Sequence, residues 1–286
     1  MTIGVSLMDF IKLQATGNDF VLIDGRRMKQ RDWSALSQKM CHRHFGVGAD
    51  GILLILPSRK ADFYMRMFNP DGSEAEACGN GLRCAGIYAI ENGLARDKEI
   101  KIETPAGIKI LRKQGKKSIQ VDMGKPVLAP AAIPVLVERK GTSKSAPVID
   151  YPLAIGKRKL EITCVSMGNP HAVFFLDRPV AEFPLAEIGP KVEHHPAFPN
   201  RVNFEIVNVL SRSKLKARVW ERGAGETLSC GTGACAIAVA ARLKNLSGSS
   251  VDIILPGGTL TTDWDGRGEV FLSGPTEVVF EGKWQD

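Results

Sequence analysis

The stretch Ala77–Gly86 reads A-C-G-N-G-L-R-C-A-G, and the stretch Ser229–Ala236 repeats its pattern as S-C-G-T-G-A-C-A. When each residue n is compared with residue n+152, Cys78 falls on Cys230 and the flanking glycines match without a gap. Solenoids and propellers repeat every ~20–50 residues, whereas a period of about 150 residues is typical of a duplicated domain. The sequence therefore predicts two copies of one unit.

Each copy shows the same succession of elements. A G-N turn leads into a short apolar strand, at 20–24 in the first copy and at 172–176 in the second. After each cysteine comes a run of small and apolar residues, Leu82–Ile90 and Ala234–Leu243. Both runs are too apolar for a surface position, so we expect helices that are buried on all sides and wrapped by strands.

The string G-V-G-A-D-G at Gly46–Gly51 matches the glycine pattern of dinucleotide-binding loops. That fingerprint needs a helix after it, because the N-terminus of the helix holds the pyrophosphate. Here an apolar strand, I-L-L-I-L, follows instead. We therefore interpret these glycines as a turn that feeds a strand.

Other segments carry weaker signals. Apolar residues at helical spacing predict a surface helix at 31–40, with Asp32 near its start. The segment Pro126–Pro147 is rich in proline, lysine and serine and is our candidate linker between the copies. The basic segment Lys109–Lys117 is interpreted as a solvated hairpin.

Composition excludes several classes of protein. The chain has 286 residues, of which 44% are hydrophobic and 24% charged, a balance typical of an ordinary globular protein. It contains no apolar run of the ~18 residues that a membrane span needs. The net charge of +7 is scattered along the chain. We therefore expect neither nucleic acid nor a membrane as a partner.

Cysteine usage points to a reducing compartment. The chain has six cysteines and no C-x-x-C pair, and its first ten residues lead us to expect no secretory signal. This pattern argues against a disulfide framework, a zinc ribbon and a thioredoxin-like site, and it favours the cytoplasm. Four cysteines are interpreted as small buried apolar residues, namely Cys41, Cys84, Cys164 and Cys235.

The remaining two cysteines, Cys78 and Cys230, each precede a G-x-G at the start of a predicted buried helix. The helix dipole there is expected to lower the pKa of the thiol. The unpaired N–H groups of the first turn can hold a carboxylate, and these belong to Gly79, Asn80, Gly231 and Thr232. Two thiols on opposite sides of the carbon next to that carboxylate suit racemisation or epimerisation of an amino acid without a cofactor.

The chain resembles the diaminopimelate epimerase family, which belongs to the cofactor-independent, two-cysteine amino-acid racemases. The resemblance covers nearly the whole chain. It rests on T-G-N-D-F (16–20), H-F-G-V-G-A-D-G (44–51), F-N-P-D-G-S-E (68–74), A-C-G-N-G-L-R-C (77–84), G-N-P-H (168–171), R-V-N-F (201–204) and W-E-R-G-A-G-E-T-L-S-C-G-T-G-A-C-A (220–236). It implies interconversion of L,L- and meso-2,6-diaminopimelate, on the route to lysine and peptidoglycan precursors.

The resemblance also implies roles for single residues. Cys78 and Cys230 would be the two acid–base thiols, and His171 and Glu221 would support catalysis. Arg222 would bind the distal carboxylate of the substrate and Glu221 its distal ammonium group. To the four helix-start positions above, the resemblance adds the substrate-binding residues Asn18, Asn69, Asn169, Asn203, Glu221 and Arg222. No metal ligand is expected.

The fold implied by the resemblance is α/β (α+β), with two pseudo-symmetric domains. Each would be a mixed, barrel-like sheet wrapped around a central hydrophobic helix, with the active site in the cleft between them. The N-terminal repeat would span 1–127 and the C-terminal repeat 128–275. The last strand, at about 276–286, is left open to return to the N-terminal repeat. The expected partners are the small-molecule substrate and a second copy of the chain in a homodimer.

Three alternatives stay open at the level of the sequence. A proline or hydroxyproline racemase has the same cysteine pair but no need of Glu221 and Arg222. The phenazine-biosynthesis isomerases usually lack the cysteine pair, so this sequence argues against them. A dithiol redox or metal-binding protein is the alternative from a different class.

Overall fold

The structure is a computed structural model that describes residues 7–75, 78–95, 99–115, 118–138, 141 and 143–285. The chain divides into two compact units. Unit 1 comprises Met1–Val121 and Ser273–Asp286, and unit 2 comprises Asp122–Leu272, where the sequence led us to expect boundaries at 127 and 275. None of the described helices is long and apolar enough to cross a membrane.

The strands of unit 1 form a mixed sheet. β1 runs antiparallel to β2, β2 parallel to β3, and β3 antiparallel to β4. β4 runs parallel to β6, β6 antiparallel to β7, and β7 antiparallel to β8. The bounds are β1 Leu7–Ala15, β2 Asn18–Asp24, β3 Gly51–Leu56, β4 Phe63–Phe68, β5 Glu74–Ala75, β6 Glu99–Thr104, β7 Gly107–Gln114 and β8 Ser118–Asp122.

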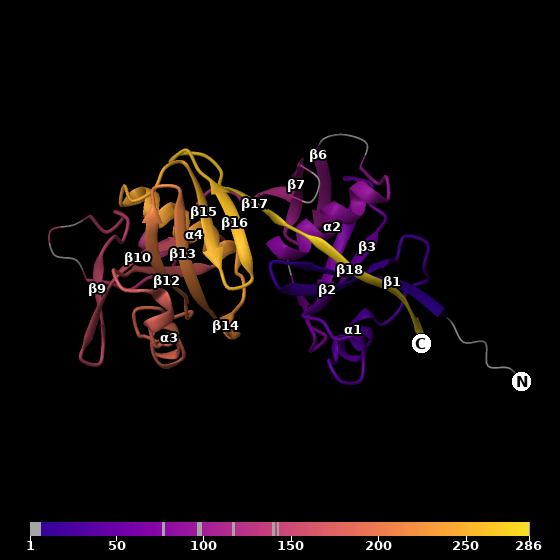
Figure 1. The fold of residues 1–286 in the computed structure, drawn as a ribbon, viewed down its shortest axis with the longest axis horizontal. Helices are drawn as coiled ribbons and strands as arrows, with labels where there is room; N and C mark the ends of the chain where they lie inside the picture. The colour runs from indigo at the N-terminus through magenta and orange to yellow at the C-terminus, as the bar shows by residue number, and fades with distance from the viewer. Residues whose placement is uncertain are drawn as a thin grey trace, which may run out of the picture. The chain divides into compact units, whose positions relative to one another are not determined.

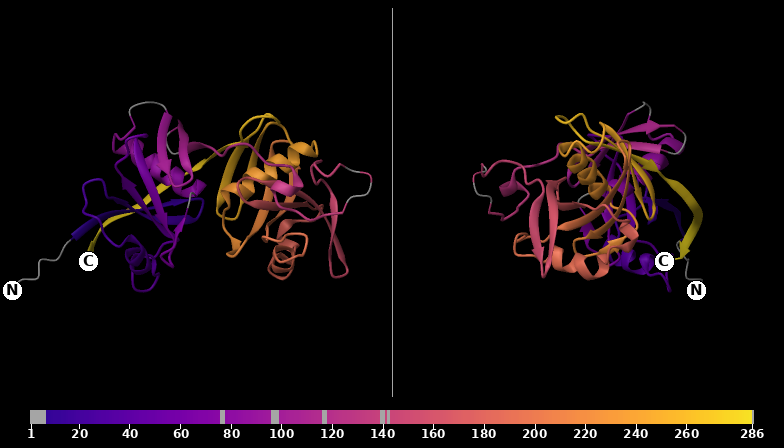
Figure 2. Two further views of the ribbon diagram at one scale, coloured as in Figure 1. Left: turned by 180° about the vertical axis from the view of Figure 1, so that it is seen from behind. Right: turned by 60° about the vertical axis from the view of Figure 1, so that its left-hand side comes forward.

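The last two strands, β17 (Phe271–Pro275) and β18 (Glu277–Gln285), complete this sheet. β17 pairs with β8, and β18 pairs antiparallel with β1. Both views of the ribbon show β18, in yellow, running beside the indigo β1 (Figures 1 and 2). Because β17 leads directly into β18, one stretch of chain joins the first strand of the sheet to the last, which gives a barrel-like sheet.

Unit 2 repeats the pairing order of unit 1. β10 runs antiparallel to β11, β11 parallel to β12, and β12 antiparallel to β13. β13 runs parallel to β15, and β15 antiparallel to β16, while β9 adds to β10. The bounds are β9 Tyr151–Ile155, β10 Arg158–Ser166, β11 Pro170–Phe175, β12 Asn203–Ser211, β13 Lys214–Glu221, β14 Gly225–Thr227, β15 Ser250–Leu255 and β16 Gly258–Asp263. The duplicated mixed fold expected from the sequence is confirmed.

The helices of the two units match residue for residue. α1 (Trp33–Cys41) and α3 (Leu185–Glu193) begin 152 positions apart, as do α2 (Gly79–Glu91) and α4 (Gly231–Leu243). The helix expected at 31–40 is therefore present, and the Asp32 side chain caps it by accepting a hydrogen bond from Ala35 N at 3.0 Å. α3 was not predicted, because Pro190 lies inside it and further prolines flank it.

Both central helices are buried, as the sequence predicted. Every residue of α2 from Asn80 to Ala89 is buried, and α2 packs against β1, β2, β3 and β7. α4 is buried from Gly233 to Ala241 and packs against β10, β11, β12, β15 and β16. Figure 1 shows each helix among the strands of its own unit. The start of each helix is consequently held by the surrounding sheet.

The glycine-rich loop after α1 folds back over the end of that helix. Gly46 N donates to His42 O at 2.8 Å, and Gly48 N donates to Met40 O at 2.9 Å. A β-carbon at position 46 would lie 2.2 Å from Lys39 O, so only glycine fits there. β3 follows directly, which confirms that these glycines form a turn feeding a strand.

The segment interpreted as a linker contributes to a core instead. It contains a 3-10 helix at Pro130–Ala132, and Ile133 and Val135 are buried in the apolar cluster that also holds Phe204 of unit 2. The prediction overlooked these apolar side chains because proline and lysine dominate the segment. Residues 139, 140 and 142 lie outside the described part of the chain.

Candidate active site

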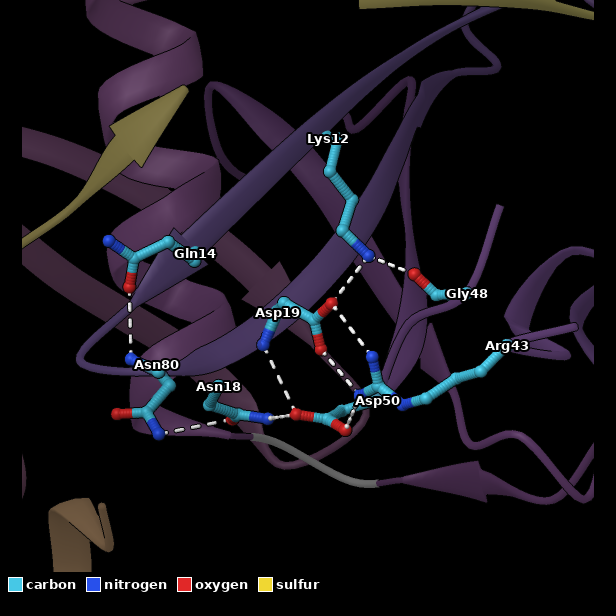
Figure 3. Close-up of polar contacts among 9 residues, drawn as sticks. Lys12, Gln14, Asn18, Asp19, Arg43, Gly48, Asp50 and Asn80 are labelled. Carbon is cyan, nitrogen blue, oxygen red and sulfur yellow. Dashed lines mark hydrogen bonds and ion pairs between the residues drawn. The ribbon is translucent and has the colours of Figure 1, made fainter. Parts of the chain in front are cut away.

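Cys78 is the residue that precedes α2, and its backbone is extended, with φ −136° and ψ 123°. Its Sγ lies 3.8 Å from Asn18 Oδ1, to which it donates. Asn80 Nδ2 donates to the same oxygen at 3.0 Å, as Figure 3 shows. Three residues predicted for the site, on β2 and at the start of α2, are thus brought together in unit 1.

An ionic network fixes the orientation of Asn18 (Figure 3). Asn18 Nδ2 donates to Asp50 Oδ2 at 2.7 Å, and Arg43 pairs with Asp50 Oδ1 at 2.7 Å. A carboxylate can only accept hydrogen bonds, so Asn18 presents its NH₂ to Asp50 and its carbonyl oxygen to Cys78. Asp50 was not among the predicted site residues, although it belongs to the G-V-G-A-D-G string.

The same network holds a second carboxylate close by. Burial alone would raise the pKa of Asp19, but hydrogen bonds from Arg43 and Lys12 outweigh burial and lower that pKa below its usual value. The ammonium group of Lys12, which is 6% exposed, also donates to Gly48 O. The glycine-rich loop is therefore tied to the strands that carry Asn18.

Asn69 is a further predicted position in unit 1. Asn69 Nδ2 donates to Ser73 Oγ at 3.0 Å in the turn after β4, and the residue is half-buried. A β-carbon at Gly51 would lie 2.8 Å from Phe68 O, so a side chain does not fit at that position in this chain.

Cys230 precedes α4 and is 5% exposed. Its Sγ donates to Glu221 Oε2 at 3.2 Å and accepts from Gly233 N at 3.4 Å. Thr232 Oγ1 lies 3.5 Å from the same sulfur. Glu221, at the end of β13, is itself held by Thr227 Oγ1, which donates to its Oε1 at 2.6 Å.

Burial raises the pKa of the Cys230 thiol well above its ordinary value, and the carboxylate of Glu221 raises it further. The hydrogen bonds from Thr232 and Gly233 N act in the opposite direction but are outweighed. The expectation that the helix dipole lowers this pKa is therefore wrong for Cys230. Desolvation of the thiolate and the charge of a carboxylate 3.2 Å away both disfavour the ionised form.

Arg222 and Asn203 form a second group in unit 2. Asn203 is 2% exposed, and its Oδ1 accepts from Arg222 N at 2.9 Å while its Nδ2 donates to Pro170 O at 2.8 Å. The guanidinium of Arg222 is exposed and donates to Asn200 O at 3.0 Å. Asn203 thus positions the backbone at Arg222.

His171 lies on β11, fully buried, with a contact on each ring nitrogen. Its Nδ1 lies 2.6 Å from Glu205 Oε1, and its Nε2 lies 2.9 Å from Asn169 Oδ1. Glu205, on β12, is also fully buried. Glu205 was not predicted, although a single acid inside the apolar run F-E-I-V is a recognisable signal.

The four other cysteines are buried, as predicted, and none of the six forms a disulfide. Burial raises the pKa of Cys41 to about 12 and also raises the pKa of Cys84. Over the described part of the chain, no group of three or more His, Cys, Asp or Glu side chains is arranged to hold a metal ion.

Comparison with known proteins places the chain in a family. A model of the family "Diaminopimelate epimerase" matches residues 10–129 and 163–279. The chain is 47% identical over 281 residues to diaminopimelate epimerase of Acetivibrio thermocellus, covering 96% of this chain and 98% of that protein. It is 45% identical over 281 residues to diaminopimelate epimerase of Methanococcus maripaludis, covering 96% and 99%. The chain belongs to the diaminopimelate epimerase family.

Solved structures extend the likeness of this family member to more distant proteins. A PhzF-family phenazine biosynthesis protein of Bacillus anthracis matches with a TM-score of 0.71 at 17% identity, covering 98% of this chain and 100% of that chain. A hydroxyproline epimerase of Agrobacterium vitis matches with a TM-score of 0.67 at 15% identity, covering 99% and 92%. At these identities the likeness concerns the fold alone.

In this diaminopimelate epimerase family member, the predicted site residues form two sets. In unit 1, Cys78 and Asn80 both contact Asn18, and Gly79 begins the helix that follows Cys78, whereas Asn69 contacts Ser73 in the turn after β4. In unit 2, Glu221 and Thr232 contact Cys230, and Gly231 begins the helix that follows it, whereas Asn203 contacts Arg222 and Asn169 contacts His171. Their roles toward a substrate stay predictions.

The contact between Glu221 and Cys230 leads to a first test. Replacing Glu221 by glutamine removes the negative charge beside the thiol, so the pKa of Cys230 should fall and its thiolate should form at lower pH. We expect alkylation of Cys230 by iodoacetamide at pH 8 to become about tenfold faster, as for a pKa lowered by one unit. The rate is measured by mass spectrometry of the peptide that contains Cys230.

Glu226→Gln is the matched control, because Glu226 pairs with Arg218 on the same hairpin and does not contact the sulfur. Its alkylation rate should equal that of the unmodified protein. An equal or slower rate for Glu221→Gln would show that Glu221 does not hold the thiol in its protonated form.

Proposed function

We propose that the chain is a cofactor-independent epimerase that interconverts L,L- and meso-2,6-diaminopimelate, in the synthesis of lysine and peptidoglycan precursors. The observation that carries the proposal is the pair of thiols, Cys78 and Cys230, each placed before the first residue of a buried helix at repeat-equivalent positions. Identity of 47% to diaminopimelate epimerases over 96% of the chain supports the choice of substrate.

The proposed reaction is a proton exchange at the α-carbon. The thiolate of one cysteine removes the α-proton and becomes a thiol, and the thiol of the other gives its proton to the opposite face and becomes a thiolate. The roles exchange in the reverse direction. Because the pKa of Cys230 is raised and its Sγ donates to Glu221, we assign Cys230 the role of the acid in the direction in which Cys78 removes the proton.

The two helix starts supply the stabilisation that this step needs. The α-proton is a very weak acid, so the charge that develops on the substrate carboxylate must be stabilised. In the first turn of a helix the N–H groups have no partner within the helix, and they lie at the positive end of the helix dipole. Here these groups belong to Gly79, Asn80, Gly231 and Thr232. We propose that they bind the carboxylate at the reacting centre. No cofactor takes part in these steps.

Recognition of the distal end is assigned to exposed polar groups of unit 2. Asn203 holds the backbone N–H of Arg222, and the guanidinium of Arg222 is exposed. We propose that this guanidinium binds the distal carboxylate of the substrate. Glu221 is occupied by Cys230 and Thr227, so its contribution to the distal ammonium group is secondary to its contact with the thiol. Asn18, Asn69 and Asn169 supply neutral donors and acceptors.

Proton NMR in deuterated water tests this function. The reduced protein is incubated with L,L-diaminopimelate and, in parallel, with L-proline, without pyridoxal phosphate. We expect loss of the α-proton signal of diaminopimelate with appearance of the meso form, and no exchange of proline. Exchange of proline alone would move the chain to the proline and hydroxyproline racemases. If neither diaminopimelate nor proline exchanges its α-proton, the two thiols would be assigned to a dithiol redox or metal-binding function instead.

Arg222→Ala tests the substrate assignment within the same assay. Loss of a charge-assisted, bidentate contact to the distal carboxylate should lower kcat/KM for diaminopimelate about 100-fold. The matched control is Arg267→Ala, in an exposed turn of unit 2, which should stay within twofold of the unmodified protein. Equal activity of the two variants would remove Arg222 from the binding site.

The homodimer expected from the sequence stays a prediction, as does the cytoplasmic location. Sedimentation velocity of the purified chain checks the first. A dimer at micromolar concentration is the expected result, and a single species of 31.1 kDa would contradict it.

A further inference from the structure

Unit 2 buries ionisable side chains where unit 1 has only apolar ones. In the parallel pair β11–β12, His171 is opposite Asn203, as Phe20 is opposite Gly51 in the pair β2–β3. The same register places Glu205 where unit 1 has Leu53. Burying polar groups costs free energy that Phe20 and Leu53 do not cost. Because the two units otherwise match, we expect that His171 and Glu205 have a function in unit 2 that offsets this cost.

The buried side chains form a chain of contacts that ends at a predicted substrate-binding residue. Glu205 Oε1 lies 2.6 Å from His171 Nδ1, and His171 Nε2 lies 2.9 Å from Asn169 Oδ1. Asn169 is the only one of the three with solvent exposure, and it follows the turn at Gly168. Glu205 is thus linked through His171 to a residue at the surface of the site.

Glu205 has one oxygen without a hydrogen bond. Within the described part of the chain, its Oε2 is buried and has no partner. An ionised carboxylate is costly in this position, because its charge is desolvated and half of its hydrogen-bonding capacity is unused. Burial raises the pKa of Glu205, and the charge of nearby Glu221 raises it further, against the opposing effect of His171. Both observations favour a protonated carboxyl group.

The charged and titratable groups that face Glu205 come from three elements. His171 faces it from β11, and Glu221 faces it from β13. From α4, Cys230 is coupled to it electrostatically, and a β-carbon at Gly233 would lie 3.1 Å from Glu205 Oε1. Two of these three groups, Glu221 and Cys230, are acids, so the surroundings disfavour a further negative charge.

We propose that Glu205 is a positioning residue: as a neutral carboxyl group it donates to His171 Nδ1, so that His171 donates from Nε2 to Asn169 and fixes the orientation of its amide. The carbonyl oxygen of Asn169 is then occupied, and its NH₂ group faces the other way. This donor is suited to a carboxylate of the substrate, a step that rests on the function proposed above.

The repeat-equivalent residue in unit 1 has the opposite orientation. Asn18 gives its NH₂ to Asp50 and turns its carbonyl oxygen toward Cys78 and Asn80. Asn169 gives its carbonyl oxygen to His171. The two matching turns therefore differ: the carbonyl oxygen of Asn18 accepts from Cys78 and Asn80 within unit 1, whereas the carbonyl oxygen of Asn169 is held by His171.

The tautomer of His171 is tested first, without any assay of activity. The protein is labelled with ¹⁵N in its histidine rings, and two-bond ¹H–¹⁵N correlation spectra are recorded between pH 6.5 and 8. The signal of His171 is assigned by its absence from the spectrum of His171→Gln. We expect the pattern of a ring protonated at Nε2 alone. A proton at Nδ1 alone, or on both nitrogens, would overturn the proposal.

Variants at Glu205 test the consequence for catalysis. Leucine, the residue of the matching position in unit 1, leaves His171 Nδ1 without a donor, and kcat/KM should fall about 100-fold. Glutamine is neutral and can donate from Nε2, so Glu205→Gln should restore activity to within tenfold of the unmodified protein. A larger loss in Glu205→Gln would show that the charge of a carboxylate is needed. If Glu205→Leu does not fold, the comparison of Glu205→Gln with the unmodified protein decides alone.

A double-mutant cycle shows whether Glu205 acts through Asn169. In an Asn169→Ala background, Glu205→Leu should lower kcat/KM by less than threefold, because the group that it positions is already gone. A full 100-fold loss in that background would overturn the proposal. If the unmodified protein does not epimerise diaminopimelate, the proposed function fails, and the histidine spectrum still decides the hydrogen-bond chain.

Discussion

Replacing either Cys78 or Cys230 by alanine is expected to abolish the conversion of L,L-diaminopimelate to the meso form. Epimerisation requires one group that removes the proton and another that returns it on the opposite face, so the two single variants should be equally inactive. General acid–base catalysis contributes up to about 10⁴-fold, and we expect a loss of at least that size. The measurement is the rate at which the meso form appears in the NMR assay.

Cys235→Ala is the matched control for this experiment. Cys235 lies on α4, is fully buried and, like the two thiols, forms no disulfide. Its replacement removes a sulfur from the same helix and should leave the rate of epimerisation unchanged. An active Cys78→Ala or Cys230→Ala variant would reject the two-thiol mechanism, whichever substrate the protein accepts.

The second large effect concerns stability. Gly46→Ala places a methyl group 2.2 Å from Lys39 O and 2.7 Å from Met40 O, where backbone atoms cannot move without breaking the end of α1. Overpacking of this kind costs up to about 3 kcal/mol, and the backbone location puts this substitution at the upper end. Urea unfolding followed by circular dichroism measures the change in the free energy of unfolding.

Gly248→Ala supplies the comparison for the loop. Its added methyl group would lie no closer than 3.8 Å to any atom outside its neighbours, and its φ is not positive. We expect a free energy of unfolding that is unchanged or raised by up to about 1 kcal/mol, because alanine restricts the unfolded chain. Equal stability of the two variants would mean that the loop at Gly46 adapts.

Much of the architecture could be predicted from the sequence because the duplicated unit repeats the same short motifs and apolar runs. The offset of 152 residues between the two cysteines also relates α2 to α4 and α1 to α3. The apolar runs after the cysteines identified the buried helices directly. α3 was not predicted, because Pro190 indicates a break in a helix although the apolar residues around it have helical spacing.

The parts of the site that were missed depend on contacts between distant segments. Glu205 meets His171 across 34 residues, and Asp50 meets Asn18 across 32. Parallel strand pairing brings the residues of each contact together, and sequence motifs do not show which strands pair. The pKa of Cys230 was misjudged for the same reason: the helix start is visible in the sequence, whereas the depth of burial and the approach of Glu221 are not.

The return of β18 to β1 has a consequence for the order in which the protein can fold during synthesis. Unit 2 is one continuous segment, Asp122–Leu272, and the whole of it is synthesised before β18. Unit 1 begins with β1 but lacks its partner β18 until residues 277–285 have been synthesised. The unit that is encoded first is therefore completed last, and until then β1 exposes an unpaired edge to chaperones and to other nascent chains.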